Sequence, residues 1–303
     1  METPGPESQT RAGSTRIRVL SSIALIPVAV LAIYLGGWPF TALVAVAGLI
    51  MVGEWAVMID QQADGFSPTP GTIAAFFPVH NAAFRGLAPM AALAFVFAGF
   101  HLYALALLVA GSGGLFAFVR VYRLRGQRFW AAFGALYLIV PCVALVWLRA
   151  AVPHGGILTF SVFVVVWATD IAAFFAGRII GGPKLLPAVS PKKTWSGTLC
   201  GVLAGSCAFV LIGLGFLDVP ENPHRIGLYG GQLALAGAGL AIASIVGDMA
   251  ESAMKRGFGV KDSGDLIPGH GGALDRLDGM IFATIAMCLA LVVYRFLQMT
   301  TAG

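Results

Sequence analysis

The chain has 303 residues, of which 58% are hydrophobic and 11% are charged, and it carries a formal net charge of +5. An ordinary soluble domain has about 25% charged residues, so this composition excludes that class and indicates a polytopic membrane protein. The positive charge does not indicate nucleic-acid binding, because the basic residues lie in short segments between apolar runs and form no stripe with interleaved aromatic residues.

The first 15 residues form a polar segment rich in Gly, Pro, Ser and Thr. Such a composition buries too little apolar surface to fold, which predicts a disordered cytoplasmic tail over residues 1–15. Arg16 and Arg18 then precede an apolar run that no small-residue cleavage site follows. We therefore expect a retained first membrane span and not a cleaved signal peptide.

Nine apolar runs approach the ~20 residues that a helix needs to cross a bilayer. The predicted fold class is therefore all-α, a polytopic integral membrane protein with about nine transmembrane helices. The runs cover approximately Val19–Leu35, Pro39–Ile59, Gly86–Phe100, His101–Val119, Phe129–Leu148, Ile157–Ala176, Trp195–Leu217, Gln232–Met254 and Leu277–Leu297. The break between the third and fourth runs is the least clearly marked.

The distribution of basic residues predicts the orientation. With nine spans and a cytoplasmic N-terminus, 16 of the 19 Lys and Arg residues fall on the cytoplasmic side, and only Arg149, Arg225 and Arg295 lie outside. The positive-inside rule describes such an asymmetry. We therefore expect a cytoplasmic N-terminus and an external C-terminus.

The densest cluster of charge, residues 252–278, lies between the last two apolar runs. Around its start, four polar residues at spacing i, i+3, i+4 and i+7 share one helical face: Asp248, Glu251, Ser252 and Lys255. Ionisable residues near the end of a membrane helix are costly to place there and usually functional. The alternative is that these acids only form a helix end that pairs with Lys255.

The same cluster ends with Asp275 and Asp278, one helical turn apart where the last apolar run begins. Before them, the glycines of Pro268–Gly272 permit left-handed backbone and N–H groups that point toward phosphate oxygens. Acids in a first helical turn also complement the helix dipole without any catalytic duty. Because acids flank the loop on both sides, we favour a shared Mg²⁺ site, since this ion needs only one or two carboxylates beside phosphate substrates. The pattern indicates a metal-dependent nucleotide or phosphoryl site.

A second polar block precedes the seventh apolar run. Lys192 and Lys193 follow Ser190 and precede Thr194 just before a helix start, where basic residues and free N–H groups suit phosphate. The alternative is that the two lysines are ordinary positive-inside charges.

Two acids stand within apolar runs. Asp170 lies near the cytoplasmic end of the sixth run, and its alternative role is a buried ion pair with Arg178. We expect Glu54, in the second run, to serve packing or a polar network and not to be a ligand.

The polar residues of the charged cluster stand at the spacing of the signature of phosphatidate cytidylyltransferases, also called CDP-diacylglycerol synthases. The matching positions are Ser252, Lys255–Arg256, Lys261–Asp262, Gly264, His270–Gly272 and Asp275–Asp278. The block Ser190–Trp195 and the segment Asp170–Gly177 also resemble that family. By motif, the resemblance covers roughly the C-terminal half of the chain.

The chain departs from the family pattern at three positions. Ala273 stands where a larger aliphatic residue is usual, and Gly279 where Ser is common. We expect these two departures to alter packing only. Ser196 stands where the family commonly has Glu, so we assign it no role.

The resemblance implies transfer of the cytidylyl group of CTP to phosphatidate, which gives CDP-diacylglycerol and pyrophosphate in phospholipid biosynthesis. It implies Mg²⁺ held by Asp248 and Asp275, with Asp278, Glu251 and Asp262 as further ligands or as residues that support the ligands, and it leaves a second cation open. The implied catalytic residues are Asp248, Asp275, Lys255, Arg256, Lys261, Asp262, His270 and Arg276. The implied substrate-binding residues are Ser190, Lys192, Lys193, Thr194, Ser252, Gly271 and Gly272. His270 has the alternative role of capping a turn.

The implied partners are CTP, phosphatidate and the lipid bilayer, and a homodimer is left open. We expect a multi-pass protein of the inner membrane with a cytoplasmic active site, N-terminal transmembrane helices over 16–150 and a catalytic region over 151–303.

Other functions are alternatives to cytidylyl transfer. A CTP-dependent lipid kinase would need many of the same metal-binding and basic residues. A CDP-alcohol phosphotransferase is disfavoured, because Asp278-Gly279 is followed as far as Val293 only by apolar residues, Thr284 and Cys288. A proton-coupled transporter would place polar groups near the middle of several spans, whereas here they gather at one face.

Overall fold

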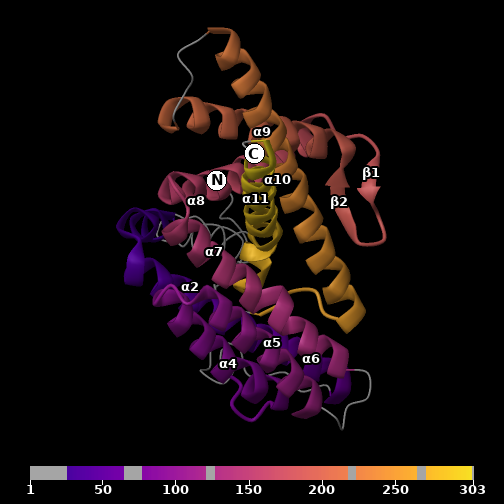
Figure 1. The fold of residues 1–303 in the computed structure, drawn as a ribbon. Helices are drawn as coiled ribbons and strands as arrows, with labels where there is room; N and C mark the ends of the chain where they lie inside the picture. Colours follow the sequence, from indigo (N-terminus) through magenta and orange to yellow (C-terminus); the bar gives the residue numbers. More distant parts are fainter. Residues whose placement is uncertain (1–25, 65–76, 121–126, 218–222, 265–270, 302–303) are drawn as a thin grey trace, which may run out of the picture. The chain divides into compact units, whose positions relative to one another are not determined.

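The computed structural model describes residues 26–64, 77–120, 127–217, 223–264 and 271–301 (Figure 1). These residues fall into two compact units. The first unit lies within Met1–Ile139 and Phe258–Arg276, and the second within Val140–Gly257 and Leu277–Gly303.

The elements follow one another as helices with a single short hairpin among the described residues. The first unit contains a helix over Ile26–Leu35, α2 (Gly37–Asp64), α4 (Ala82–Gly99), α5 (Tyr103–Arg120), α6 (Arg128–Gly134) and the π-helix η1 (Ala135–Ile139). The second contains α7 (Val140–Ala151), α8 (Gly155–Ile179), β1 (Lys184–Leu186), β2 (Ser190–Thr194) and α9 (Trp195–Phe216), with most of α10 (Pro223–Phe258) and α11 (Leu274–Thr301).

Seven helical segments among the described residues are long and apolar enough to cross a membrane. They are Gly37–Asp60, Ala82–Gly99, Arg128–Ala151, Gly155–Ile179, Trp195–Phe216, Tyr229–Phe258 and Leu274–Phe296. Shorter apolar helices cover Ile26–Leu35 and Tyr103–Val119. The predicted helical, multi-pass membrane fold is confirmed, whereas the count of nine spans and the cytoplasmic N-terminus stay predictions.

Most predicted spans agree with observed helices to within a few residues. The main difference is α10, which begins at Pro223, well before the predicted start at Gln232. Proline suits the first position of a helix because its missing N–H would have had no partner there. Most of the segment between the predicted seventh and eighth spans is therefore helical from Pro223 onward.

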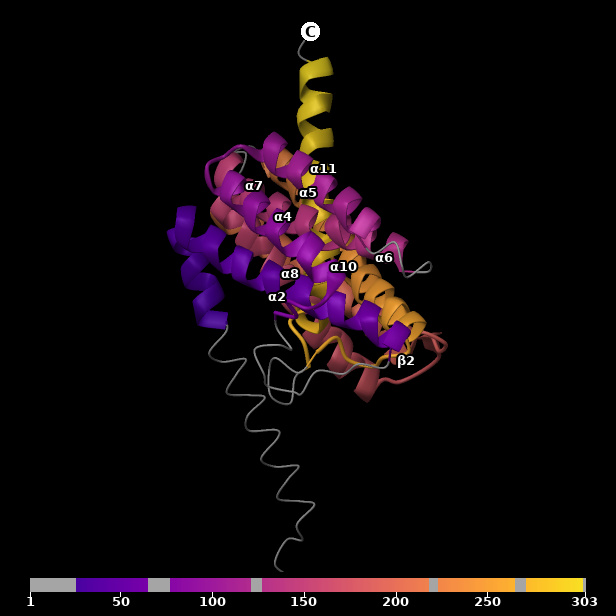
Figure 2. The same cartoon turned by 90° about the horizontal axis from the view of Figure 1, so that it is seen from below.

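The first unit packs α2 against α4 and α6, and α4 lies beside α5 (Figures 1 and 2). Trp55 of α2 is fully buried, and its Nε1 donates to the carbonyl of Trp130 at 3.0 Å. Its ring centroid lies 5.5 Å from that of Tyr137 and 5.6 Å from that of Phe258. Because Phe258 is the last residue of α10, this aromatic cluster fixes the start of the segment that leads to α11.

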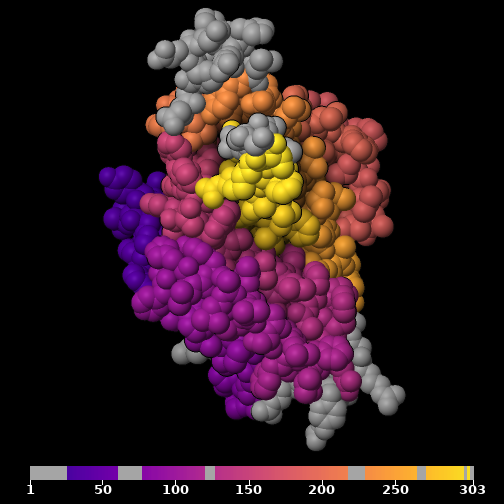
Figure 3. All heavy atoms as spheres, in the orientation of Figure 1, coloured from indigo at the N-terminus to yellow at the C-terminus, as the bar shows by residue number. Residues whose placement is uncertain are grey.

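The second unit packs α8 along α9, and β2 contacts both helices. The antiparallel hairpin, which was not predicted, pairs Lys184 with Thr194 and Leu186 with Ser190. It lies at the surface of its unit (Figure 3). The hairpin therefore presents the polar block of the sequence on a strand that leads directly into α9.

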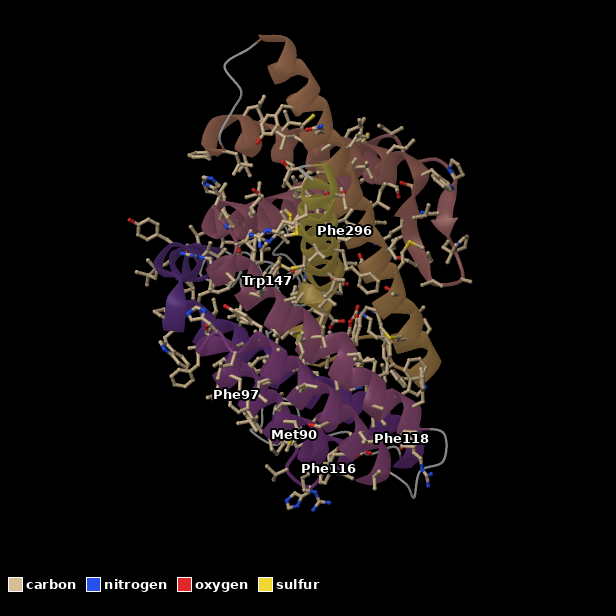
Figure 4. All side chains as sticks on the ribbon, viewed as in Figure 1. Met90, Phe97, Phe116, Phe118, Trp147 and Phe296 are labelled. Atoms are coloured by element: carbon tan, nitrogen blue, oxygen red, sulfur yellow. The ribbon has the colours of Figure 1, made fainter. Side chains whose placement is uncertain are left out.

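Large apolar side chains are exposed on the outside of the helices. Phe116 and Phe118 of α5 and Phe296 of α11, which Figure 4 labels, are exposed. A soluble protein rarely exposes so much apolar surface, which agrees with helices that face lipid.

Candidate functional site

Carboxylates from three helices of the second unit lie near one another. Asp278 of α11 lies close enough to Asp248 and Glu251 of α10, and to Asp170 of α8, to interact electrostatically with each. Glu251 is only 1% exposed. Asp170 is exposed and so is not the buried partner that the alternative pairing with Arg178 required.

Two glycines explain how α10 and α11 bring their acids together. A Cβ atom at Gly247 would lie 2.7 Å from the carbonyl oxygen of Asp278, and one at Gly279 would lie 2.5 Å from Oγ of Ser244. A side chain at Gly247 would require the backbone of α11 to shift, and one at Gly279 would require Ser244 to move, so both glycines permit a close helix crossing. The crossing places Asp248, which follows Gly247, beside Asp278. Gly279 thus has the packing role expected from the sequence.

Two lysines offset part of this negative charge. Nζ of Lys193 lies 2.6 Å from Oδ2 of Asp248, and Nζ of Lys255 lies 2.8 Å from Oε2 of Glu251. Oγ of Ser252 donates to Oδ1 of Asp248 over 3.4 Å. The alternative interpretation, in which the acids pair with Lys255, therefore holds for Glu251. Asp248 pairs instead with Lys193 of the hairpin.

The polar block before α9 forms strand β2. Thr194 is buried, and its Oγ1 accepts a hydrogen bond from the backbone N–H of Gly197 at 3.2 Å, which makes it the N-cap of α9. Lys192 is exposed, whereas Lys193 and Ser190 are half-buried. Thr194 thus has a structural duty, and the two lysines stand immediately before a helix N-terminus.

The described end of the glycine-rich turn, Gly271 and Gly272, belongs to the first unit and is held by Asp275. Its Oδ2 accepts hydrogen bonds from the backbone N–H of Gly272 at 2.9 Å and of Ser263 at 3.0 Å. The N–H of Asp275 donates to Oγ of Ser263 at 3.3 Å. Gly271 has a φ of 82°, a left-handed conformation that favours glycine. One oxygen of Asp275 is therefore engaged in shaping the turn.

Glu54 of α2 holds the other side of this turn. Its carboxylate accepts hydrogen bonds from the backbone N–H groups of Ala273 and Leu274, both at 2.8 Å, and from Oγ of Ser263 at 3.3 Å. The polar-network role expected for Glu54 is confirmed. Its link to the charged cluster was missed, although an acid inside an apolar run was a signal for such a role.

The remaining predicted site residues either are exposed or lie outside the residues that the structure describes. The exposed charged residues are Arg256, Lys261, Asp262 and Arg276. His270 and the start of the turn, residues 265–270, lie outside the described residues. Asp248 belongs to the second unit and Asp275 to the first, so their sharing of one metal ion stays a prediction.

The donor set can be compared with the needs of Mg²⁺. Within the described ranges, no group of three or more His, Cys, Asp or Glu side chains is arranged to hold a metal ion. The neighbouring carboxylates of Asp248 and Asp278 nevertheless supply hard oxygen ligands, and Mg²⁺ beside phosphates needs only one or two of them. The residues therefore fit this ion by their chemistry.

Comparison with known proteins identifies the family. The family model described as "Cytidylyltransferase family" matches residues 16–294. The chain is 36% identical over 272 residues to a phosphatidate cytidylyltransferase of Brucella suis biovar 1 (strain 1330), which covers 90% of this chain and 91% of the relative. Over 131 residues it is 43% identical to the phosphatidate cytidylyltransferase of Haemophilus influenzae, which covers 43% of this chain and 44% of that protein. The chain therefore belongs to the cytidylyltransferase family.

Proposed function

We propose that this protein transfers the cytidylyl group of CTP to phosphatidate, the activity that the names of its relatives carry. A phosphate oxygen of phosphatidate attacks the α-phosphorus of CTP, the bond from that phosphorus to the bridging oxygen breaks, and pyrophosphate leaves. The products are CDP-diacylglycerol and pyrophosphate, so no protein nucleophile is needed.

The observation that carries the proposal is the contact of Lys193 with Asp248 beside Asp278. The reaction brings two polyanions together, which requires positive charge next to groups that bind a divalent cation. Both kinds of group come from the segments that carry the family resemblance, β2 and the adjoining ends of α10 and α11. This agreement between sequence motif and geometry supports cytidylyl transfer.

Each set of residues has a role in the proposed site. Asp248, Asp275, Asp278 and Glu251 would hold Mg²⁺, which when bound neutralises phosphate charge, and a second cation is left open. The phosphate-binding residues would be Lys192, Lys193, Lys255, Arg256, Lys261 and Arg276. Gly271 and Gly272 would shape the pocket, while Asp262, Ser190, Ser252 and His270 would support it. Nζ of Lys193, which is paired with a carboxylate in the structure, would donate to a phosphate oxygen as an alternative partner.

We further propose that the site faces the cytoplasm from the inner membrane of a bacterium. The support is the predicted excess of Lys and Arg residues on one side of nine spans, with the N-terminus on that side. CTP is a cytoplasmic substrate, and phosphatidate is supplied by the bilayer itself. The division into N-terminal helices over 16–150 and a catalytic region over 151–303 belongs to the same proposal, and a homodimer is left open.

The test is an assay of the purified full chain in mixed micelles with CTP and Mg²⁺. One arm contains phosphatidate and the other contains diacylglycerol of the same acyl chains, and mass spectrometry identifies the lipid product. We expect CDP-diacylglycerol in the first arm and no new lipid in the second. Phosphorylation of diacylglycerol would favour the CTP-dependent lipid kinase and contradict the proposal.

A further inference from the structure

Glu54 is a buried acid that lies far in sequence from the charged cluster and yet contacts it directly. The residue is 2% exposed. It forms hydrogen bonds with Ala273 and Leu274, which lie 219 and 220 positions further along the chain. We propose that Glu54 is a positioning residue, which holds the glycine-rich turn and the first turn of α11 in the arrangement that substrate binding requires. The kinetic part of this inference rests on the proposed cytidylyl transfer.

The first turn of α11 needs an external acceptor. The first N–H groups of any helix have no partner within the helix, and Ser, Thr, Asp or Asn at the N-cap usually satisfies them. Here Ala273 precedes the first helical residue, Leu274, and has no polar side chain. The carboxylate of Glu54 accepts both of these N–H groups at 2.8 Å, so α2 supplies the cap that the local sequence lacks. Its negative charge also complements the positive end of the helix dipole.

Two glycines leave room for this carboxylate. A Cβ atom at Gly264 would lie 3.0 Å from Oε1 of Glu54, and one at Gly272 would lie 2.6 Å from Oε2. Gly264 and Gly272 therefore approach the two oxygens of Glu54 closely. Because Glu54 is 2% exposed, its effect on substrate passes through the residues that it holds.

Ser263 extends the effect to the predicted site residues. Its Oγ contacts Oε2 of Glu54 and the N–H of Asp275, both at 3.3 Å, and its own N–H donates to Oδ2 of Asp275 at 3.0 Å. Lys261 lies two residues before Ser263 in the sequence, and Arg276 immediately follows Asp275. Loss of the Glu54 anchor should therefore displace charged residues at both ends of the turn, and a displacement of about 1 Å costs about 100-fold in rate.

The test is Glu54→Gln in the full chain. Glutamine preserves the volume of the side chain but replaces one accepting oxygen with an NH₂ donor, which faces a backbone donor. We expect kcat/KM for CTP to fall about 100-fold, with a rise in KM for CTP. A rise in KM is diagnostic, because a smaller folded fraction lowers the apparent kcat but leaves KM unchanged.

The matched control is Met51→Ala, which truncates another side chain of α2 that is 2% exposed. It tests whether general destabilisation of this helix changes KM for CTP, and we expect that it does not. Glu54→Asp keeps the charge with a shorter reach, and we expect a KM between those of the wild type and Glu54→Gln.

A second measurement tests the anchor without substrate. Hydrogen exchange followed by mass spectrometry should show faster exchange over residues 271–275 in Glu54→Gln and in the milder variant Ser263→Ala, with wild-type exchange there in Met51→Ala. Failure of the wild type to form CDP-diacylglycerol would reject the proposed function but leave this exchange test valid. Wild-type exchange over residues 271–275 in both variants would overturn the inference, as would a wild-type KM for CTP in Glu54→Gln.

Discussion

Nζ of Lys193 lies 2.6 Å from Oδ2 of Asp248, which joins the hairpin strand β2 to α10 within the second unit. The pair is partly exposed, with 25% and 33% of the two side chains accessible. Asp248 also lies close enough to Asp278 to interact with it electrostatically. The ammonium group of Lys193 is therefore positioned where negative charge is concentrated, as a phosphate-binding group must be.

Lys193→Ala should impair turnover more than Lys192→Ala. A hydrogen bond to a charged group contributes about 1.5–3 kcal/mol, which corresponds to roughly 10–100-fold in kcat/KM for Lys193→Ala. Lys192 is exposed, so Lys192→Ala should lower kcat/KM less than Lys193→Ala does. Steady-state constants of the two variants, measured for CTP and phosphatidate, provide the comparison. Equal losses in the two variants would show that the contact with Asp248 has no special importance.

Asp278→Asn should separate stability from activity. The substitution replaces a carboxyl group whose charged form is disfavoured first by burial and then by the nearby acids Asp248, Glu251 and Asp170. Relief of about 1 kcal/mol would raise Tm by about 2–4 °C in a domain of this size, when no divalent cation is present. Turnover at limiting Mg²⁺ should fall sharply in the same variant. A variant with wild-type turnover at limiting Mg²⁺ would remove Asp278 from the site.

Gly272→Ala should destabilise the protein, because the added methyl group would collide with Glu54. The added Cβ would lie 2.6 Å from Oε2 of Glu54, and over-packing of this kind costs about 1–3 kcal/mol. Gly239→Ala is the matched control, because a Cβ at Gly239 meets nothing within 4 Å. Thermal unfolding and turnover of both variants in detergent test the prediction. A Gly272→Ala protein as stable and active as Gly239→Ala would show that the turn adapts without loss.

Single-cysteine labelling tests the membrane orientation. In a background without the four native cysteines, Leu124→Cys and Ser190→Cys should react with an impermeant maleimide only after the cells are permeabilised. Asn222→Cys should react in intact cells. This pattern follows from the 16 basic residues predicted to lie inside. The reverse pattern would place the site on the external face.

The sequence predicted the features that depend on local spacing. Apolar runs of about 20 residues located most membrane helices, and the i, i+4 spacing of Glu251 and Lys255 predicted their shared face, where they form an ion pair at 2.8 Å. The lysines before α9 were also placed correctly, because Thr194 has the residue type of an N-cap.

Contacts between distant segments could not be predicted in the same way. Spacing along one helix says nothing about which neighbour approaches it, so Lys255 was the only partner considered for the helix acids and Lys193 was missed. The hairpin residues around Pro191 show no alternation of apolar and polar residues, which is the usual signal of a strand. The cap that Glu54 provides for Ala273 depends on the packing of α2, which no local pattern specifies.

The most direct test of cytidylyl transfer asks which phosphorus of CTP is attacked. Purified protein is supplied with Mg²⁺, phosphatidate and CTP that carries a radioactive phosphorus at either the α or the γ position. Attack at the α-phosphorus joins that atom to the lipid phosphate and releases the γ-phosphorus in pyrophosphate. We predict α-label in the lipid and γ-label in pyrophosphate. Lipid that carries the γ-label would contradict the account, because it would mean transfer of the terminal phosphoryl group.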